Sequence, residues 1–392
     1  MAFEQSFYRD SWVEVNLDAI KQNIKSLQQV LPKEKKIFAV VKANAYGHGD
    51  IPVAKTALEA GAYGVAVALL DEALRLRSAG ITAPILVLGW VRPDAVTIAS
   101  EKNITLTVFQ KEWMEEAKRH LQNKTLSIHI KVDTGMGRIG LKSKEELQQL
   151  LSSTDLNTFQ ITGIYTHYAT ADEEDLAYYE KQREQFEEML PIIKKYAPNA
   201  LVHADNSAAS MRFPTDSYDA VRFGISMYGL YPSPFVKEEN PMPLHPAFSL
   251  FSQLTHVKTI HQAESISYGR TYQAQEETIV GTVPLGYADG WIRKLQGSDV
   301  LVDGKRMPII GRICMDQFMI KLDKPYPIGT KVTLIGKDGK EEITVDEVAE
   351  RLETINYEIP CIISTRVPRI YMSDGENVQT VNSVLNENNL FK

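Results

Sequence analysis

Cysteine is scarce in this chain of 392 residues, in which only Cys314 and Cys361 occur. Two cysteines exclude a disulfide framework and are typical of a reducing compartment. The first residues, MAFEQSFYRDSWVEV, lack a basic start followed by an apolar stretch, and no long apolar run occurs elsewhere. We therefore expect neither a secretory signal nor a membrane span, and predict a cytoplasmic protein.

An excess of positive charge is also missing. The 43 Lys and Arg residues are outnumbered by 50 Asp and Glu residues, which gives a formal net charge of −7. This balance argues against nucleic acid or an anionic membrane as the main partner. The metal-ligand spacings HxH and CxxC are absent, so we expect no metal site and interpret His48, His129 and His256 as structural.

Short β-branched segments alternate with amphipathic helical segments from about residue 37 to residue 230. Eight strands, each followed by a helix, are the count of a closed parallel barrel. A doubly wound sheet stays open as an alternative, because periodicity does not detect closure. The predicted strands are residues 37–43, 63–68, 84–89, 104–108, 127–133, 161–167, 201–206 and 220–224.

The proline-rich stretch NPMPLHP, at residues 240–246, marks a change of pattern. Beyond it, β-rich runs are divided by turn signals such as VDGK and GKDGK, with one predicted helix in TVDEVAERLE. We predict an α/β protein with a (β/α)8 TIM-type barrel in residues 1–240 and a mostly-β domain in residues 241–392. The early segment WVEVNLDAI is a candidate to pair with the β domain instead.

Polar side chains stand at the predicted C-terminal ends of the barrel strands, the face that carries the active site in such barrels. Lys42 ends the first strand, where a solvated cap is the ordinary interpretation. The other strand-end residues are Lys131 with Asp133, His167, His203 with Asn206 and Ser207, and Arg222 with Gly224.

The ends of strands seven and eight, ADNSAAS and RFGISMYG, are suited to phosphate, because small residues let backbone N–H groups approach an anion. A buried lysine beside a phosphate site indicates a Schiff base with pyridoxal phosphate. Desolvation would favour the neutral amine that such a bond requires.

Eight short motifs point to a family: KANAYGHG, KVDTGMGRIG, THYATAD, HADNSAAS, VRFGISMYG, SISYGRTY, LGYADG and GRICMDQ. In this order, and along nearly the whole chain, they resemble the alanine racemases. The resemblance implies a homodimer with shared active sites, pyridoxal 5'-phosphate on Lys42, and interconversion of L-alanine and D-alanine. It also implies a supply of D-alanine for peptidoglycan.

Inversion at Cα requires one proton to leave and another to arrive on the opposite face, which two bases achieve directly. By resemblance, Lys42 serves the D-alanine side and Tyr268, from the partner subunit, serves the L-alanine side. A free tyrosine has a pKa of about 10. Arg222, hydrogen-bonded to His167, is expected to assist it. Without its motif, Tyr268 would be interpreted as a half-buried tyrosine of the β domain.

The arginine that matches Arg222 faces the pyridine nitrogen in the family. Because a guanidinium stays protonated, the ring nitrogen does not, and the cofactor becomes a weaker electron sink. We expect this arrangement to suppress transamination. Without its motif, Arg222 would be an ordinary surface arginine or ion-pair partner.

Other roles follow by matching position. Arg138 resembles the arginine that bonds the phenolic oxygen of the cofactor and contacts the substrate, and Met315 resembles the residue whose backbone receives the substrate carboxylate. Tyr287 and Tyr357 match the entrance, which Tyr357 narrows in favour of alanine. The resemblance assigns cofactor binding to Lys42, Tyr46, Arg138, His167, Asn206, Ser207, Arg222, Gly224, Ile225 and Tyr357.

Two positions leave alternatives open. Lys131 matches a lysine that is carbamylated in some members and holds the arginine, and an unmodified ion pair with Asp133 is the other expectation. Asp205 stands where a small neutral residue is expected. Its charge would weaken cofactor binding unless its side chain points away from the phosphate loop.

Three other kinds of protein are alternatives to an alanine racemase. A pyridoxal decarboxylase typically uses an acidic partner for the ring nitrogen, which argues against it here, whereas a racemase of broader specificity stays open. A non-catalytic protein that binds pyridoxal phosphate is a single barrel without a β domain, and so offers no counterpart of Tyr268.

Overall fold

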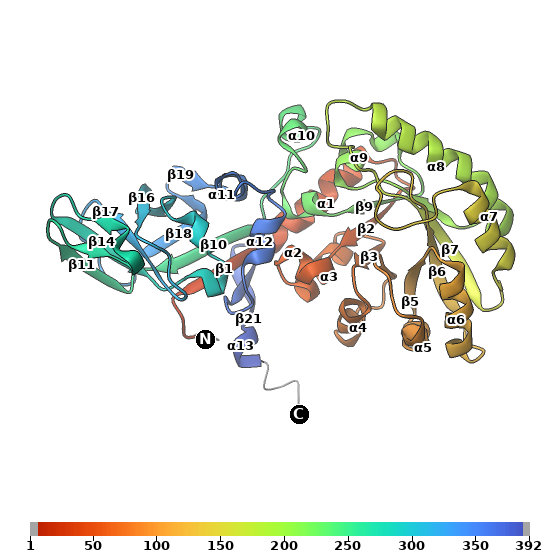
Figure 1. Cartoon of the computed structure of the whole chain (residues 1–392), viewed down its shortest axis with the longest axis horizontal. Helices are drawn as coiled ribbons and strands as arrows, with labels where there is room; N and C mark the ends of the chain where they lie inside the picture. Colours follow the sequence, from red (N-terminus) through yellow and green to blue (C-terminus); the bar gives the residue numbers. More distant parts are fainter. Residues whose placement is uncertain (1–6, 387–392) are drawn as a thin grey trace. The chain divides into compact units, whose positions relative to one another are not determined.

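The computed structural model describes residues 7–386, which fall into two compact units (Figure 1). The barrel unit comprises residues 19–45 and 50–246. The β unit comprises the residues up to Asp18, the short segment 46–49, and the chain from Ala247 onward. The change of sequence pattern predicted at residues 240–246 therefore lies in the last residues of the barrel unit.

Parallel strands close the barrel in sequence order, and its last strand pairs back with its first. This closure confirms the predicted TIM-type barrel and excludes the doubly wound sheet. Strands such as GVAV at residues 64–67 are buried at every position, because side chains fill the lumen and helices cover the outside. The barrel strands are β2 (Lys36–Val40), β3 (Gly64–Val67), β4 (Ile85–Val87), β5 (Ile104–Val108), β6 (Leu126–Lys131), β7 (Phe159–Tyr165), β8 (Leu201–His203) and β9 (Ala220–Phe223).

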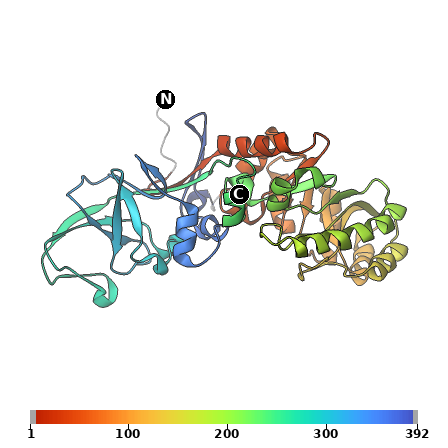
Figure 2. The ribbon, with the colours of Figure 1, turned by 90° about the horizontal axis from the view of Figure 1, so that it is seen from above.

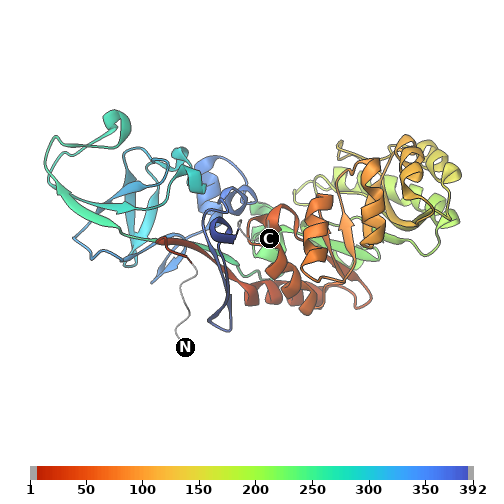
Figure 3. The same cartoon turned by 90° about the horizontal axis from the view of Figure 1, so that it is seen from below.

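Amphipathic helices cover the outside of the barrel. The main ones are α1 (Leu17–Val30), α3 (Asp50–Glu59), α4 (Leu70–Ser78), α5 (Val96–Glu101), α6 (Lys111–Leu121), α7 (Lys144–Ser153), α8 (Ala177–Tyr196), α9 (Ser207–Arg212) and α10 (Pro234–Glu239). In α6, Trp113, Met114, Ala117 and Leu121 are buried, a spacing of three and four residues that forms one apolar face. Figure 2 shows α1 and α8 on different sides of the barrel, and Figure 3 shows the orange helices beside one another on its outer surface.

The predicted mostly-β domain is confirmed, and antiparallel pairing dominates the β unit. Within the described residues one sheet has the order β11-β14-β17-β16-β15-β18-β10-β1-β20-β21, with β19 paired to β18. Its strands are β1 (Ser11–Asn16), β10 (Phe248–Gln253), β11 (His256–Ile260), β14 (Thr278–Val283), β15 (Asp299–Val302), β16 (Lys305–Ile310), β17 (Phe318–Leu322), β18 (Lys331–Asp338), β19 (Glu341–Ile343), β20 (Arg369–Ser373) and β21 (Glu376–Val381). The early strand β1 lies between β10 and β20, which is the pairing considered for WVEVNLDAI.

Short elements complete the β unit. The predicted helix TVDEVAERLE is α11 (Val345–Leu352), whereas α12 (Glu358–Ile362) and α13 (Ser383–Asn386) were not predicted. A small apolar cluster of Ile260, Ile266, Ala274, Val280 and Ile310 supports a two-stranded hairpin of β12 (Ser265–Ile266) and β13 (Tyr272–Gln273). Among the helices of residues 7–386, none combines the length and the apolar composition that crossing a membrane would need.

Gly229 ends the short 3₁₀ helix η3 (Ile225–Tyr228), which follows the last barrel strand. Its φ is +84°, and a Cβ placed on it would lie 2.0 Å from the carbonyl oxygen of His245. Gly80, which follows α4, has the same φ of +84°, but nothing lies within 4 Å of its hypothetical Cβ. The two glycines therefore share a backbone conformation and differ in the space beside them.

We expect Gly80→Ala to lower the free energy of unfolding by about 1 kcal/mol, the cost of a left-handed alanine. Gly229→Ala should lower it by about 3 kcal/mol, because the backbone at His245 must also move away. Urea unfolding of both variants, followed by circular dichroism, measures the difference. Equal losses in the two variants would show that the close packing beside Gly229 relaxes without cost.

Candidate active site

Lys42 lies at the start of a left-handed turn that follows β2. The predicted strand 37–43 ends earlier, at Val40, because residues 43–45 of α2 (Lys42–Tyr46) have φ values of 53°, 53° and 52°. Left-handed backbone costs about 1–2 kcal/mol per residue outside glycine, so this turn needs external support. The side chain of Lys42 is half-buried rather than fully buried as expected.

Glu72 in α4 supplies that support. Its Oε1 accepts a hydrogen bond from the backbone N–H of Ala43 at 2.7 Å. Its Oε2 accepts from the N–H groups of Ala68 at 2.8 Å and Leu69 at 3.1 Å. One carboxylate thus joins the turn after Lys42 to the end of the neighbouring β3 strand and the start of α4.

Arg222, in β9, is 3% exposed and is surrounded by neutral acceptors. Its Nη2 donates to the carbonyl oxygens of Ala204 at 2.6 Å and Thr166 at 2.9 Å. Its Nη2 also lies 3.1 Å from Nδ1 of His167, the contact expected from the sequence, and its Nη1 lies 2.7 Å from Nδ1 of His203. Within residues 7–386, no carboxylate forms an ion pair with this guanidinium.

One donor of Arg222 is left over. Among the described residues, its Nε–H donates to no protein acceptor. Burial lowers the pKa of Arg222 to about 10, so the side chain stays charged at neutral pH. A buried cation with an unused N–H fits a neutral ring nitrogen as its remaining acceptor.

Positive charge gathers at this end of the barrel. The pKa of His167 lies well below its usual range, first because of burial and then because of the charges of Arg222, Arg138, Lys131 and Lys42. His167 is therefore neutral and accepts a hydrogen bond, and the four cations lie near it. Such a surplus of positive charge suits an anionic ligand.

Lys131, the last residue of β6, is buried, and its Nζ donates to the carbonyl oxygen of Val132 at 2.7 Å. The expected ion pair with Asp133 is wrong for the described structure, because Asp133 Oδ1 instead accepts the N–H groups of Gly135 at 3.1 Å and Gly137 at 3.0 Å. Burial, followed by neighbouring guanidinium charge, lowers the pKa of Lys131 to about 7. A partly neutral amine is the form that carbamylation requires.

Ser207, at the start of α9, faces the turn after β9. Its Oγ accepts from the N–H of Gly224 at 2.9 Å and more weakly from that of Ser226 at 3.4 Å. Gly224 therefore donates to this hydroxyl rather than to an outside anion. In the described chain the proton of the Ser207 hydroxyl has no protein acceptor, and Ile225, the first residue of η3, has no acceptor within that turn for its N–H. These two donors suit a phosphate oxygen.

Asn206 has a structural task. It is the N-cap of α9, and its Oδ1 accepts from the N–H of Ala209 at 3.1 Å. Its Nδ2 donates to the carbonyl oxygen of Tyr168 at 3.3 Å. Asn206 therefore positions the start of α9.

The β unit presents Tyr268 on the tip of the β12–β13 hairpin, in the 3₁₀ turn η4 (Tyr268–Arg270). The side chain is 70% exposed, not half-buried. Ser267, just before it, has a φ of +65°, and its Oγ donates to the carbonyl oxygen of Arg312 at 2.6 Å. A strained and anchored backbone therefore holds an exposed tyrosine, which is typical of functional sites.

Met315 and Tyr287 lie on two loops that are hydrogen-bonded to each other. The N–H of Tyr287 donates to the carbonyl oxygen of Cys314 at 3.1 Å, and that of Ala288 donates to Met315 at 3.0 Å. Met315 is 53% exposed, and its own N–H has no protein acceptor among the described residues. This N–H suits a carboxylate. Tyr46 and Tyr357 form a separate pair in the β unit, with ring centroids 6.3 Å apart.

Comparison with known proteins identifies the family. Residues 15–232 match the family model for the alanine racemase N-terminal domain, and residues 247–371 match that for the C-terminal domain. The chain belongs to the alanine racemase family. Alanine racemase 1 of Bacillus subtilis (strain 168) is 52% identical over 384 residues, 97% of this chain and 98% of that protein. The match confirms the resemblance predicted from the eight motifs.

Solved structures of racemases are also similar to this chain. A crystal structure of alanine racemase from Bacillus anthracis with bound L-Ala-P has a TM-score of 0.94 and 50% identity, and the match covers 97% of this chain and 99% of that one. A histidine racemase from Leuconostoc mesenteroides subsp. sake has a TM-score of 0.87 and 33% identity, with 93% and 99% covered. The two names differ in the amino acid, although the fold is shared.

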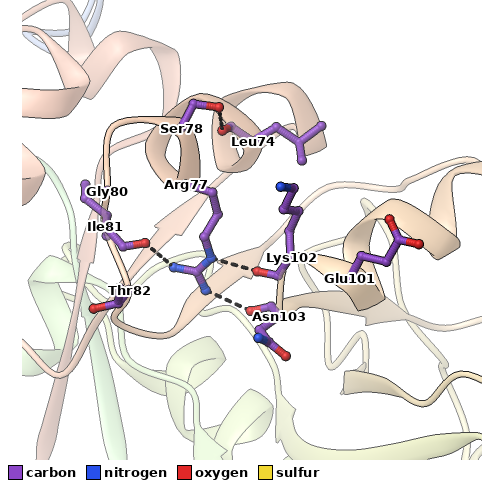
Figure 4. Close-up of a pocket in the computed structure, with 9 residues that line it drawn as sticks. All are labelled: Leu74, Arg77, Ser78, Gly80, Ile81, Thr82, Glu101, Lys102 and Asn103. Atoms are coloured by element: carbon purple, nitrogen blue, oxygen red, sulfur yellow. Dashed lines mark hydrogen bonds between the residues drawn. The ribbon is translucent and has the colours of Figure 1, made fainter.

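One pocket of this racemase-family chain lies away from the candidate residues. It has a volume of about 320 Å³ and lies beside Arg77, at the N-terminal ends of β4 and β5 (Figure 4). The guanidinium of Arg77 donates to the carbonyl oxygens of Ile81 at 2.7 Å, Lys102 at 2.8 Å and Asn103 at 2.8 Å. Since its donors bind backbone, we interpret Arg77 as a structural clamp between neighbouring strands.

Two features of this family member were missed in the sequence. Nothing marked Glu72 as a support of the Lys42 turn, because the contact depends on the left-handed backbone. The contact of His129 with His203, with 2.9 Å between Nδ1 and Nε2, was also missed. A signal did exist, because His129 precedes Lys131 by two residues in one strand and must share its face.

Asp205 follows β8 and is buried near Tyr168 and Tyr179. It is 3% exposed, and its Oδ2 has no hydrogen-bond partner among the described residues. Burial raises the pKa of Tyr168 and of Tyr179 in α8, and the charge of Asp205 raises both further, so its carboxyl group lies near these two side chains. Burial raises the pKa of Asp205 to about 6 from 3.8, against the opposing charge of Arg222.

Asp205 should therefore weaken the fold as pH rises, because the folded chain holds its proton more tightly than the unfolded chain does. The free energy of unfolding of Asp205→Asn minus that of the wild type should increase between pH 4 and pH 7 by about 3 kcal/mol and stay level above that range. Urea unfolding at a series of pH values measures this difference. A difference that does not vary with pH would contradict the raised pKa.

Proposed function

We propose that this chain interconverts L-alanine and D-alanine with pyridoxal phosphate as its cofactor. The observation that carries the proposal is Arg222, a buried guanidinium held by neutral acceptors whose Nε–H is left for one more neutral acceptor. The pyridine nitrogen of pyridoxal phosphate is such an acceptor. Membership of the alanine racemase family supports the same cofactor and substrate.

Pyridoxal phosphate, joined covalently to Lys42, would supply the electron sink that makes the Cα proton of alanine acidic. Lys42 then holds or moves a proton on the D-alanine side, and Tyr268 of the partner subunit does so on the L-alanine side. For each inversion one base takes the Cα proton while the other delivers its own to the opposite face. The exposure of Tyr268 within one chain supports a role toward a second subunit.

The phosphate would be held by hydroxyl and backbone donors. Ser207 offers its hydroxyl proton, and Ile225 offers its N–H. Tyr46 and Tyr357 are the tyrosines assigned to the same group by the family pattern. Asn206 and Gly224 act on this group indirectly, because Asn206 caps α9 and Gly224 binds the Ser207 hydroxyl.

Residues on loops would bind the substrate and the remaining substituents of the pyridine ring. Arg138, exposed on the loop after β6, is assigned the phenolic oxygen and a substrate contact. The unused N–H of Met315 is assigned the substrate carboxylate. Tyr287 and Tyr357 are assigned to the entrance, where bulky side chains exclude large amino acids.

Arg222 would also decide the outcome of the reaction. A guanidinium that donates to the pyridine nitrogen leaves that nitrogen without a proton, which weakens the electron sink. Protonation away from Cα, the route to transamination, is then disfavoured. His167 keeps the guanidinium in place as a neutral acceptor.

A cytoplasmic supply of D-alanine for peptidoglycan is the cellular role we infer from the family. The state of the two cysteines is consistent with this location. Cys361 is exposed and Cys314 half-buried, and they are not joined in a disulfide. Such thiols persist in a reducing compartment.

In D2O, the purified chain with pyridoxal phosphate should convert L-alanine into D-alanine that carries one deuterium at Cα. The deuterium arises because the incoming proton comes from a base that exchanges with solvent. Chiral chromatography with mass detection follows the product, and Lys42→Ala should lower the rate by at least a thousandfold. The histidine racemase relative makes L-histidine a necessary second substrate, and L-serine is tested because its side chain is nearly as small as that of alanine.

Three results would contradict this proposal. Ethylamine and carbon dioxide would point to a decarboxylase. Faster turnover of histidine or serine than of alanine would favour a racemase of different or broader specificity. Bound cofactor without change in any amino acid would favour a non-catalytic binding protein.

Mixing Lys42→Ala subunits with Tyr268→Ala subunits should restore activity if the two bases come from different subunits. Each hybrid dimer then contains one site with both native groups, so random mixing should give about a quarter of the wild-type activity. Each variant alone serves as the control. Hybrid dimers seen by native mass spectrometry but without activity would rule out shared sites.

A further inference from the structure

A chain of hydrogen bonds runs from Arg222 into the interior of the barrel. Arg222 Nη1 lies 2.7 Å from Nδ1 of His203, and Nε2 of His203 lies 2.9 Å from Nδ1 of His129. His203 is fully buried and His129 is 3% exposed. The two imidazoles therefore connect Arg222 to a residue halfway down β6.

The chemistry of Arg222 determines which atom donates and which accepts in each of these hydrogen bonds. A guanidinium only donates, so Nδ1 of His203 must accept and its proton must be on Nε2. That Nε2–H donates to Nδ1 of His129, whose own proton must then be on Nε2. Burial and the charge of Arg222 lower the pKa of His129 to about 3 and hold the pKa of His203 well below its usual range, so both imidazoles are neutral.

The far end of the chain meets a cavity. His129 lines a pocket of about 300 Å³ among residues at the beginnings of the barrel strands, including Phe38, Thr105, Ser127 and Thr162. Among the described residues, Nε2 of His129 has no protein acceptor. A pocket of this size, lined in part by hydroxyl groups, has room for a water that would accept the last proton of this hydrogen-bond chain.

The fold makes room for His129. A Cβ on Gly163 of β7 would lie 2.6 Å from atoms of the His129 ring. The register between β6 and β7 also shifts between Ile128 and His129. The ring of His203 is stacked on that of Tyr165, with centroids 4.7 Å apart and planes 7° apart. Space and packing thus hold both imidazoles in one orientation.

We propose that His203 and His129 are positioning residues for Arg222, and that they fix its guanidinium from inside the barrel through hydrogen bonds that all point away from it. This inference rests on the proposed function, in which Arg222 faces the pyridine nitrogen. It replaces the interpretation of His129 as a purely structural histidine. This chain of hydrogen bonds offers no proton donor to the region around Arg222, because the N–H group of each imidazole is directed toward the cavity.

The first test needs neither cofactor nor activity. In cofactor-free protein labelled with 15N-histidine, the side-chain nitrogens of His129 and His203 should each show a protonated Nε2 and an unprotonated Nδ1 from pH 6 to pH 9. His129→Asn identifies the signals of residue 129. A protonated Nδ1, or a charged ring, at either residue would overturn the proposed direction of the chain.

The second test uses the holoenzyme and compares two replacements of His129. His129→Asn keeps an acceptor close to the place of Nδ1, whereas His129→Leu removes it at similar volume. We expect His129→Leu to increase the amount of amine-form cofactor made per racemisation by about tenfold, the effect of loosening one hydrogen bond in a charged network. In His129→Asn, the amount of amine-form cofactor made per racemisation should stay within about threefold of the wild-type value.

A merely structural role for His129 would lower stability and total rate in both variants and leave this ratio unchanged. That result, in folded protein, would overturn the inference. If His129→Leu does not fold, Gly163→Ala displaces the ring by another route and should raise the ratio in the same way. If the wild type does not racemise alanine at all, the proposed function fails, and the nitrogen spectra alone decide whether the imidazole chain exists.

Discussion

The C-terminal end of the barrel depends on a buried guanidinium that forms no ion pair within residues 7–386. Arg222 is stabilised by carbonyl oxygens and neutral imidazoles rather than by a carboxylate, a costly arrangement unless every acceptor is well placed. Its charge then governs its neighbours. Burial, and after it the charge of Arg222, lowers the pKa of His167, His203 and Lys131, so that neutral acceptors and a partly neutral amine surround the guanidinium.

Backbone strain recurs where the candidate bases are attached. Lys42 begins a turn whose next residues have left-handed φ values, and Tyr268 follows Ser267, which has a φ of +65°. In each case a neighbouring group holds the strained segment: Glu72 binds the turn after Lys42, and the Arg312 carbonyl oxygen binds Ser267. Strain of this kind persists only when the surrounding contacts over-determine it, which fits side chains that must be held in one position.

The fold was largely readable from the sequence, because periodicity and strand count depend on local pattern. The predicted strand 104–108 agrees with β5 at both ends, and the count of eight favoured the closed barrel that the structure shows, although periodicity left a doubly wound sheet open. Predictions that depended on tertiary contacts were weaker. The strand predicted through residue 43 stops at Val40, and the aspartate expected to pair with Lys131 binds backbone N–H groups instead. No local pattern reveals such a competition between a lysine and a loop for one carboxylate.

Most candidate site residues, although not Tyr357, were recognisable because they stood at a strand end or within a family motif, whereas the contacts behind them were not recognisable. His129 lies inside β6 and carries no motif, so only its alternation with Lys131 could have placed it in the lumen. The histidine racemase relative shares the fold at a TM-score of 0.87, which shows that the fold alone does not choose the amino acid. Arg222 and its acceptors serve the cofactor rather than the substrate side chain in the proposed mechanism. Differences in substrate should therefore arise from exposed loop residues such as Tyr287 and Met315, whose backbones are tied together while their side chains stay free to vary.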